Sequence, residues 1–286
     1  MENLIITTEI ICDLPKEVLE KYNIKVCPVN YFVDGYEYNT ETNLMPASQF
    51  YANMRSGAEV KTTQVNQNEA CSFLTKYVKS GNNVLHLSFS SGLSGTYNSF
   101  VYAAKEINTK SEKKVYVIDS LCAAAGHGLF VLLVAKKAQE NNMTLEKLIN
   151  YANEIKLKIQ HIFTVDNLKY LVKGGRVSKI NAKLANLLQI KPLMKVDTDG
   201  KLVVTNKIFG RKLVIKKMFE IMTKSYNPHF ADIFICHADC KGDAQKLSKM
   251  ILDYYGIEST IVSLNYFIGG HSGPGTLSLF YVGEKR

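Results

Sequence analysis

The chain has 286 residues, of which 46% are hydrophobic and 21% charged, a composition typical of a globular protein with a substantial core. This argues against a disordered chain, and no apolar run approaches the roughly 20 residues that cross a bilayer. The net charge of +9 is spread along the chain without a nucleic-acid-binding motif. It is compatible with solvated helix faces, or with contact to an anionic ligand, an acidic protein or an anionic membrane surface, but does not predict a nucleic-acid partner.

The start of the chain has no basic region followed by a small-residue cleavage site, so we expect no signal peptide and a cytoplasmic location. The six cysteines are scattered, and in that compartment they are predicted to be core residues without disulfides. Residues 236–240 (Cys-His-Ala-Asp-Cys) faintly resemble a metal cluster. No second ligand pair follows at zinc spacing, so no metal site is predicted.

In the first half of the chain, strand-like and helix-like stretches alternate. The strand-like stretches are residues 4–8, 24–32 (interrupted at Pro28), 83–89 and 115–118. The helix-like stretches are residues 50–54, 69–78, 97–107, 126–140 and 144–155, with Thr144 as an N-cap. Alternation of this kind predicts a parallel sheet with helices on its faces.

The second half has a different pattern. Asp199-Gly200 lies between apolar runs at 192–196 and 202–206, which predicts a β-hairpin. Further strands are expected at 161–165, 232–237, 259–264 and 277–281, and helices at 168–172, 182–188, 212–224 and 243–255. We therefore predict an α/β protein with two domains: an N-terminal parallel-sheet α/β domain (residues 1–160) and a C-terminal α+β domain with a mixed sheet (residues 161–286).

The segment with the densest polar chemistry is Ser90-Ser91-Gly92-Leu93-Ser94-Gly95-Thr96-Tyr97, which follows a strand and opens a helix. Ligands of open α/β sheets bind at the carboxyl ends of the strands, and a helix N-terminus presents free N–H groups to an anion. The segment matches neither the dinucleotide fingerprint nor the P-loop. A polar loop with an N-cap serine would have similar residues, but this density of Ser and Gly favours a carboxylate or phosphate site.

Three further segments are candidates. Lys61-Thr62-Thr63-Gln64 lies between two predicted helices, where the threonines could simply be a cap. Residues 173–179 contain Gly174, Gly175 and Arg176, a cationic turn that helix termination also explains. Residues 269–275 (Gly-Gly-His-Ser-Gly-Pro-Gly) are predicted to form a loop in which His271 donates to a carboxylate or pairs with it, although an exposed loop histidine is equally compatible.

Nucleophilic catalysis is an alternative. Residues 92–96 approach the G-x-S-x-G elbow, with Thr96 in place of the last glycine, and the order Ser94, Asp119 or Asp166, His271 matches the hydrolase order. However, none of the four segments contains the carboxylate that general acid–base chemistry would use. A Ser–His hydrolase using Ser94 and His271, and a small-molecule phosphate binder, therefore stay as alternatives to a binding protein.

Taken together, the four segments resemble the DegV family. Residues 62–64 are similar to its Thr-Ser-Gln segment, and residues 90–97 match its Ser-Ser-Gly-Leu-Ser-Gly-Thr-Tyr motif without change. The family's Ile-Asp-Ser strand end, its helix with a Gly-Gly-Arg turn, and its His-x-Gly-Pro-Gly segment are found at residues 118–120, 168–176 and 271–275. Residues 187–192 (Leu-Leu-Gln-Ile-Lys-Pro) complete a set that spans nearly the whole chain in order.

The resemblance implies a protein that is not an enzyme and needs no cofactor or metal. Such a protein binds one long-chain fatty acid and serves as the carrier subunit of a bacterial fatty acid kinase, whose ATP-binding partner phosphorylates the acid for phospholipid synthesis. By that analogy, Thr62, Ser94 and His271 hold the carboxylate, and the acyl tail lies in an apolar tunnel between the domains. The supporting loop residues would be Thr63, Ser91, Gly92, Gly95, Thr96 and Gly270.

Arg176 and Arg211 are the candidates for contact with the kinase or the phosphoryl group. Hydroxyl groups and a helix N-terminus would hold the carboxylate without a buried permanent cation, and each buried methylene would contribute about 0.8 kcal/mol. The chain departs from the family pattern at Ile10 and Ile11, which replace hydroxyl residues and are expected to make one edge of the pocket more apolar. In residues 207–211, which include Phe209, only the second of two family arginines remains.

Overall fold

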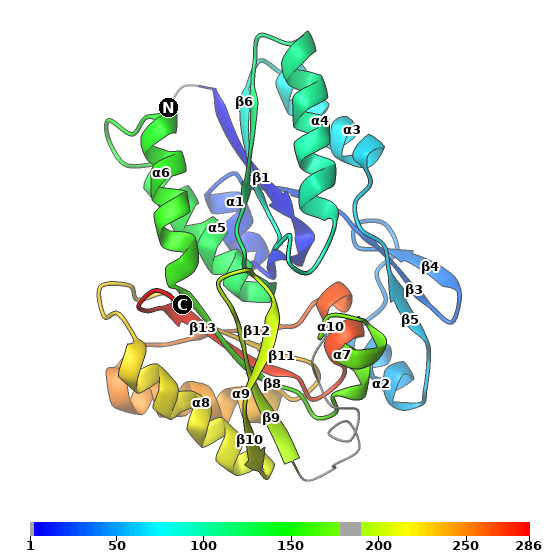
Figure 1. The fold of residues 1–286 in the computed structure, drawn as a ribbon, viewed down its shortest axis with the longest axis vertical. Helices are drawn as coiled ribbons and strands as arrows, with labels where there is room; N and C mark the ends of the chain where they lie inside the picture. Colours follow the sequence, from blue (N-terminus) through cyan, green and yellow to red (C-terminus); the bar gives the residue numbers. More distant parts are fainter. Residues whose placement is uncertain (1–2, 178–189) are drawn as a thin grey trace.

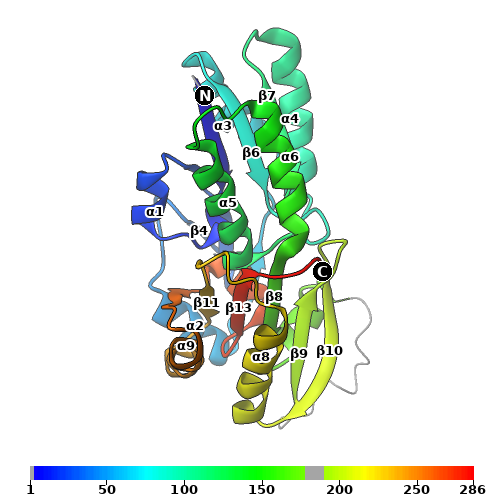
Figure 2. The ribbon, with the colours of Figure 1, turned by 90° about the vertical axis from the view of Figure 1, so that its left-hand side faces the viewer.

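The computed structural model describes residues 3–177 and 190–286. The predicted helix at 182–188, together with Ser178 and Lys179, lies outside the described residues. Within the described ranges, no helix is long and apolar enough to cross a membrane. Figures 1 and 2 show two large sheets, one above the other, with helices on their faces.

The upper sheet is parallel, as predicted. Its strand order is β2 (Lys25–Cys27), β1 (Leu4–Glu9), β6 (Asn83–Ser88) and β7 (Val115–Asp119). Figure 1 shows α3 (Gln67–Lys79) and α4 (Thr96–Lys110) on one side and α5 (Ala124–Ala138) and α6 (Leu145–Ile155) on the other. The short helices η1 (Ile10–Cys12) and α1 (Lys16–Lys21) follow β1. Strand order reverses between β1 and β6, so their carboxyl ends form the crevice where such sheets bind ligands.

The lower sheet is mixed, as predicted. Its order is β10 (Leu202–Phe209), β9 (Ile190–Val196), β8 (Ile159–Thr164), β13 (Leu277–Val282), β11 (Phe234–His237) and β12 (Thr260–Ser263). All neighbours are antiparallel except β11 and β12, and β9 and β10 form the predicted hairpin. Apolar side chains of α8 (Arg211–Ser225) and α9 (Lys241–Tyr255) share one core with one face of this sheet, and η2 (Lys156–Lys158) leads into it.

A third, antiparallel sheet was not predicted. It consists of β4 (Tyr36–Asn39), β3 (Asn30–Val33) and β5 (Val60–Thr62), with α2 (Ala47–Arg55) beside it in Figure 1. The single interrupted strand predicted at 24–32 is wrong. β2 and β3 belong to different sheets, because Pro28 separates them and proline cannot donate to a strand ladder.

α5 joins the two large sheets. It is apolar on all sides, and residues 124–135 are all buried, as expected of a helix in the middle of a protein. The core around it combines Leu85 and Ile118 of the upper sheet with Phe234 and Phe280 of the lower one. The carboxyl ends of β1 and β6 are thereby held against the lower sheet.

Candidate functional site

The Ser-Gly segment after β6 packs directly on the β9–β10 turn. The Ser90 hydroxyl donates to the Gly200 carbonyl at 2.8 Å, and the Gly92 N–H donates to the Ser90 hydroxyl at 3.2 Å. A Cβ on Gly92 would lie 2.5 Å from the Asp199 carbonyl oxygen and 2.9 Å from that of Gly200. Glycine at this position therefore lets a loop of the first half of the chain reach a hairpin of the second.

This close approach gives a test of stability. Gly92→Ala is expected to lower the free energy of unfolding by about 1–3 kcal/mol, because the added methyl group overlaps backbone atoms that cannot move alone. Gly242→Ala is the matched control, since a Cβ there meets nothing within 4 Å in α9 and alanine favours helix. Urea denaturation should separate the two variants. Equal stabilities would show that the loop is not tightly docked on the hairpin.

The segment around Thr62 contacts the same Ser-Gly loop. The Val65 N–H donates to the Thr96 hydroxyl at 3.3 Å, and Thr96 also accepts the Ser94 hydroxyl at 3.0 Å. The Ser94 hydroxyl in turn accepts a hydrogen bond from the Thr96 N–H at 3.2 Å, so it satisfies the first backbone N–H of α4. Thr62 itself ends β5, and the prediction of a loop there is only partly right.

His271 lies within hydrogen-bond distance of Thr62, with 2.7 Å between the Nε2 and Oγ1 atoms. It belongs to α10 (Tyr266–Ser272), so the prediction that residues 269–275 are all loop is wrong. Gly270 packs against Val60, and a Cβ on Gly174 would lie 2.5 Å from the His271 Nδ1 atom. Burial, with a contribution from the nearby Arg176, lowers the pKa of His271 to about 4, so its imidazole is neutral near pH 7.

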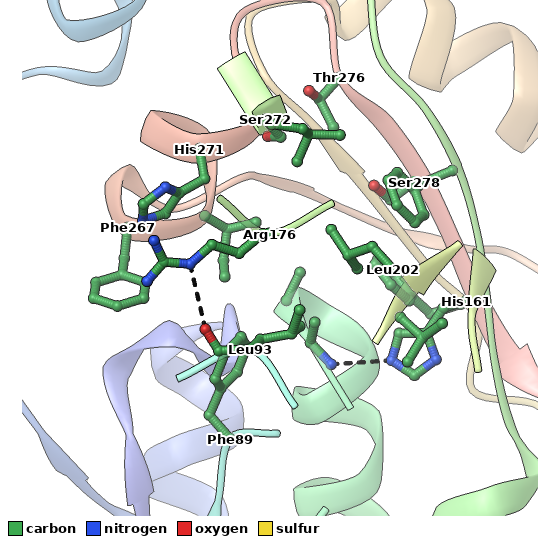
Figure 3. Close-up of a pocket in the computed structure, with 17 residues that line it drawn as sticks. Phe89, Leu93, His161, Arg176, Leu202, Phe267, His271, Ser272, Thr276 and Ser278 are labelled. Carbon is green, nitrogen blue, oxygen red and sulfur yellow. Dashed lines mark hydrogen bonds between the residues drawn. The ribbon is translucent and has the colours of Figure 1, made fainter. Parts of the chain in front are cut away.

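Arg176 lies at the same place. Figure 3 shows its guanidinium group beside the His271 imidazole, and its Nε donates to the Leu93 carbonyl at 3.3 Å. The four segments singled out in the sequence therefore meet, so far as the structure describes them. Thr62, His271 and Arg176 come from positions up to 209 residues apart in the chain.

An apolar cavity lies behind these residues, between the two large sheets (Figure 3). Its walls include Phe89, Leu93, Phe163, Leu171, Phe267 and Phe280. Arg176 and His271 line the cavity and also line a surface cleft that contains Thr62 and several lysines. The two residues thus stand between an apolar interior and a basic opening.

Of the predicted carboxylate-binding residues, His271 lines the cavity, whereas Thr62 and Ser94 do not. The predicted supporting residues are also absent from its walls: Thr63, Ser91, Gly92, Gly95, Thr96 and Gly270. The Ser91 N–H donates to Asp119 at 3.2 Å, and the Thr63 hydroxyl donates to the Asn30 carbonyl at 3.4 Å.

Two further expectations are affected by the structure. The Arg211 guanidinium donates to Asp243 at 2.8 Å and pairs with Asp166 at 3.5 Å, outside the cavity walls. Ile10 and Ile11 are not among the residues that line the cavity, and both line a separate surface groove. Among the described residues, no group of three or more His, Cys, Asp or Glu side chains could hold a metal.

Sequence reasoning missed the residues that hold α10. Asn265 is its N-cap, accepting the Ile268 N–H at 2.9 Å, and it donates from its own backbone N–H and Nδ2 to Asp13 at 3.1 and 2.8 Å. Burial raises the pKa of Asp13 to about 7. An asparagine before Tyr266-Phe267-Ile268 is an ordinary helix-start signal, so the start of α10 was readable from the sequence, whereas the Asp13 contact was not.

Known proteins resemble this chain over its whole length. The model of the DegV family, described as uncharacterised proteins, matches residues 3–284. A DegV domain-containing protein of Clostridium perfringens is 35% identical over 100% of this chain and 99% of its own. A DegV lipid-binding protein from Thermotoga maritima superposes with a TM-score of 0.84, at 29% identity, over 99% of this chain and 100% of its own.

A fatty-acid-binding DegV family protein from Streptococcus agalactiae superposes with a TM-score of 0.87, at 26% identity, over 100% of both chains. Both solved structures share the arrangement of sheets and helices that frames the cavity. The family match covers nearly every residue and includes all four segments of the site. The chain therefore belongs to the DegV family.

Proposed function

We propose that this protein binds one long-chain fatty acid, with the acyl chain in the apolar cavity and the carboxylate held by Thr62, Ser94 and His271. In this proposal it is a cytoplasmic carrier that presents the carboxylate to an ATP-dependent fatty acid kinase, and it is not itself an enzyme. The observation that carries the proposal is the apolar cavity lined by Arg176 and His271, because both residues also line the surface cleft in which His271 is bonded to Thr62.

The chemistry of that end suits a carboxylate. A carboxylate in a mostly apolar site requires charge-assisted donors. In the bonded Thr62–His271 pair, one hydrogen joins the two side chains and the other is left to donate to a carboxylate. The half-buried Arg176 adds a permanent cation beside them. We therefore infer that Arg176 contacts the carboxylate or its phosphorylated form.

Two lines of support concern the kinase role. The surface cleft that contains Thr62 also contains Lys61, Lys169, Lys173 and one carboxylate, Glu59, which pairs with Lys61 and Lys173. The net positive charge of the cleft favours an approaching anionic phosphoryl donor. Arg211 is held by Asp243 and Asp166 on a different part of the surface. In the proposal, Arg211 therefore serves to contact the kinase and not the carboxylate. A transient contact with an anionic membrane surface is compatible with the net charge.

The first test is native mass spectrometry of freshly purified protein, followed by extraction of what is bound. We expect the mass excess of one long-chain fatty acid. The Thr62→Ala/Ser94→Ala variant should lose at least roughly tenfold in affinity, because each hydrogen bond to a charged group contributes about 1.5–3 kcal/mol. Ser80→Ala/Thr109→Ala is the control, since these two hydroxyls donate only to carbonyls of their own helices.

A wild-type protein that is empty and also takes up no added fatty acid would contradict the proposal. The hydrolase alternative would then be tested with esters. The geometry does not favour it, because among the described residues Ser94 is bonded to Thr96 and His271 to Thr62, and no hydrogen bond joins Ser94 to His271. The apolar cavity also does not favour a phosphate binder, because a small polar anion gains nothing from apolar walls.

A further inference from the structure

One polar side chain in the cavity wall has no partner. The Ser272 hydroxyl is buried, with 4% of the residue exposed, and its Oγ atom makes no hydrogen bond. Serine in the last turn of a helix often donates to the carbonyl four residues earlier, but here it does not. Buried polar atoms without partners are rare in folded proteins, so this hydroxyl points to a group that the ligand brings.

The polar wall is formed by the end of α10, the turn that follows it and the start of β13. Ser272 ends α10, and Gly273 then adopts a φ of +82°, where a Cβ would lie 2.1 Å from the Tyr170 ring. This turn leads through Thr276 into β13, where Ser278 faces the same cavity. Figure 3 shows Ser272, Thr276 and Ser278 along one side, away from the apolar Phe89 and Leu93.

Thr276 and His161, two other polar residues of this wall, are already hydrogen-bonded. The Thr276 hydroxyl donates to the Gly273 carbonyl at 2.7 Å. His161 is bonded at both ring nitrogens, because Nε2 accepts the Ala123 N–H at 3.1 Å and Nδ1 therefore donates to the Ile159 carbonyl at 3.0 Å. The Ser272 hydroxyl is thus buried and unpaired in this wall, which also contains Ser278.

We propose that Ser272, together with Ser278, forms a polar subsite inside the acyl cavity that selects a fatty acid carrying a hydroxyl group on its chain. A plain acyl chain would cover the Ser272 hydroxyl with methylenes and keep it unpaired, which is unfavourable. A hydroxylated chain would exchange a hydrogen bond with it. This inference rests on the proposed function, since it names the class of fatty acid that the same cavity binds.

Thr164 provides a matched control. Its hydroxyl is also buried and unpartnered, and it lies on β8 next to the cavity residue Phe163. Successive side chains of a strand point to opposite faces, and the cross-strand neighbours of Thr164 are Leu193 and Leu277, in the core beneath α8 and α9. Thr164→Val removes a comparable hydroxyl on the other face of the sheet.

The experiment measures competitive binding to delipidated protein. The ligands are stearate and hydroxystearate isomers with the hydroxyl near the carboxylate, at mid-chain and near the methyl end. At least one isomer should bind the wild type about tenfold more tightly than stearate. Ser272→Ala should abolish that preference and bind stearate at least as tightly as the wild type, whereas Thr164→Val should keep the wild-type preference.

The failures are distinguishable. If the wild type binds stearate as tightly as it binds every hydroxystearate isomer, the polar subsite is overturned and the proposed function is unaffected. A preference that survives in the Ser272→Ala/Ser278→Ala variant would also overturn it. Absence of binding by stearate and by all isomers would overturn both the subsite and the proposed function.

Discussion

Glu9→Ala is expected to lower the free energy of unfolding by about 3–5 kcal/mol, because it removes the charge at the centre of a fully buried network. Glu9 accepts the Ser88 hydroxyl at 2.7 Å and the Phe89 N–H at 3.1 Å. His86 and His127 lie 3.4 and 3.5 Å from its carboxylate. Burial alone would raise the pKa of Glu9, but the hydrogen bonds to the two histidines outweigh it and hold that pKa well below its usual range.

The network is also linked to the cavity. The Thr8 hydroxyl lies 2.7 Å from His127 Nε2 and the Thr7 hydroxyl lies 2.9 Å from His86 Nδ1, so polar side chains connect β1 to α5 and to β6. Phe89 lines the cavity, and its backbone N–H donates to the Glu9 carboxylate. We therefore expect the Glu9→Ala variant to lose bound ligand as well as stability.

Urea denaturation of the delipidated proteins measures the effect. Glu20→Ala is the control, because the Glu20 side chain is 66% exposed and its removal should change stability by no more than about 0.5 kcal/mol. A Glu9→Ala variant within about 1 kcal/mol of the wild type would show that the histidines and hydroxyls find other partners.

Acidification should destabilise the protein partly through His271. The pKa of this residue is about 4 in the folded protein, against 6.5 for a free side chain. Below pH 6.5 the unfolded chain therefore binds a proton that the folded protein does not, and stability falls as the pH decreases from about 6.5 to about 4. The full effect is about 2–3 kcal/mol, reduced somewhat because the side chain is partly exposed.

The contribution of His271 is isolated by comparison with His271→Gln. The stability difference between the wild type and this variant should change by that amount across the pH range and stay constant above pH 7. Burial also lowers the pKa of His161 well below 6.5, which adds to the same trend in both proteins, whereas the raised pKa of Asp13 acts in the opposite direction. A difference independent of pH would show that His271 is not protected from protonation by the fold.

Local sequence patterns determined much of the architecture. Alternating apolar stretches predicted the parallel sheet of β1, β6 and β7, and Asp199-Gly200 predicted the β9–β10 hairpin, because periodicity and turn chemistry are properties of neighbouring residues. The N-cap at Thr144 is confirmed by its hydrogen bond from the Lys147 N–H. Local signals were weaker at Pro28, where two short strands of different sheets look like one.

The order of the motifs along the chain is enough to identify the family, and the same motifs contain Thr62, His271 and Arg176. Their meeting is a tertiary event: β5, α10 and the turn after α7 (Lys169–Lys173) are brought together by packing on the two sheets. The unpaired Ser272 hydroxyl and the buried charge of Glu9 exist only because distant segments close around them. A polar side chain is ordinary in a sequence, and it becomes a binding group or a source of stability when the fold removes it from water.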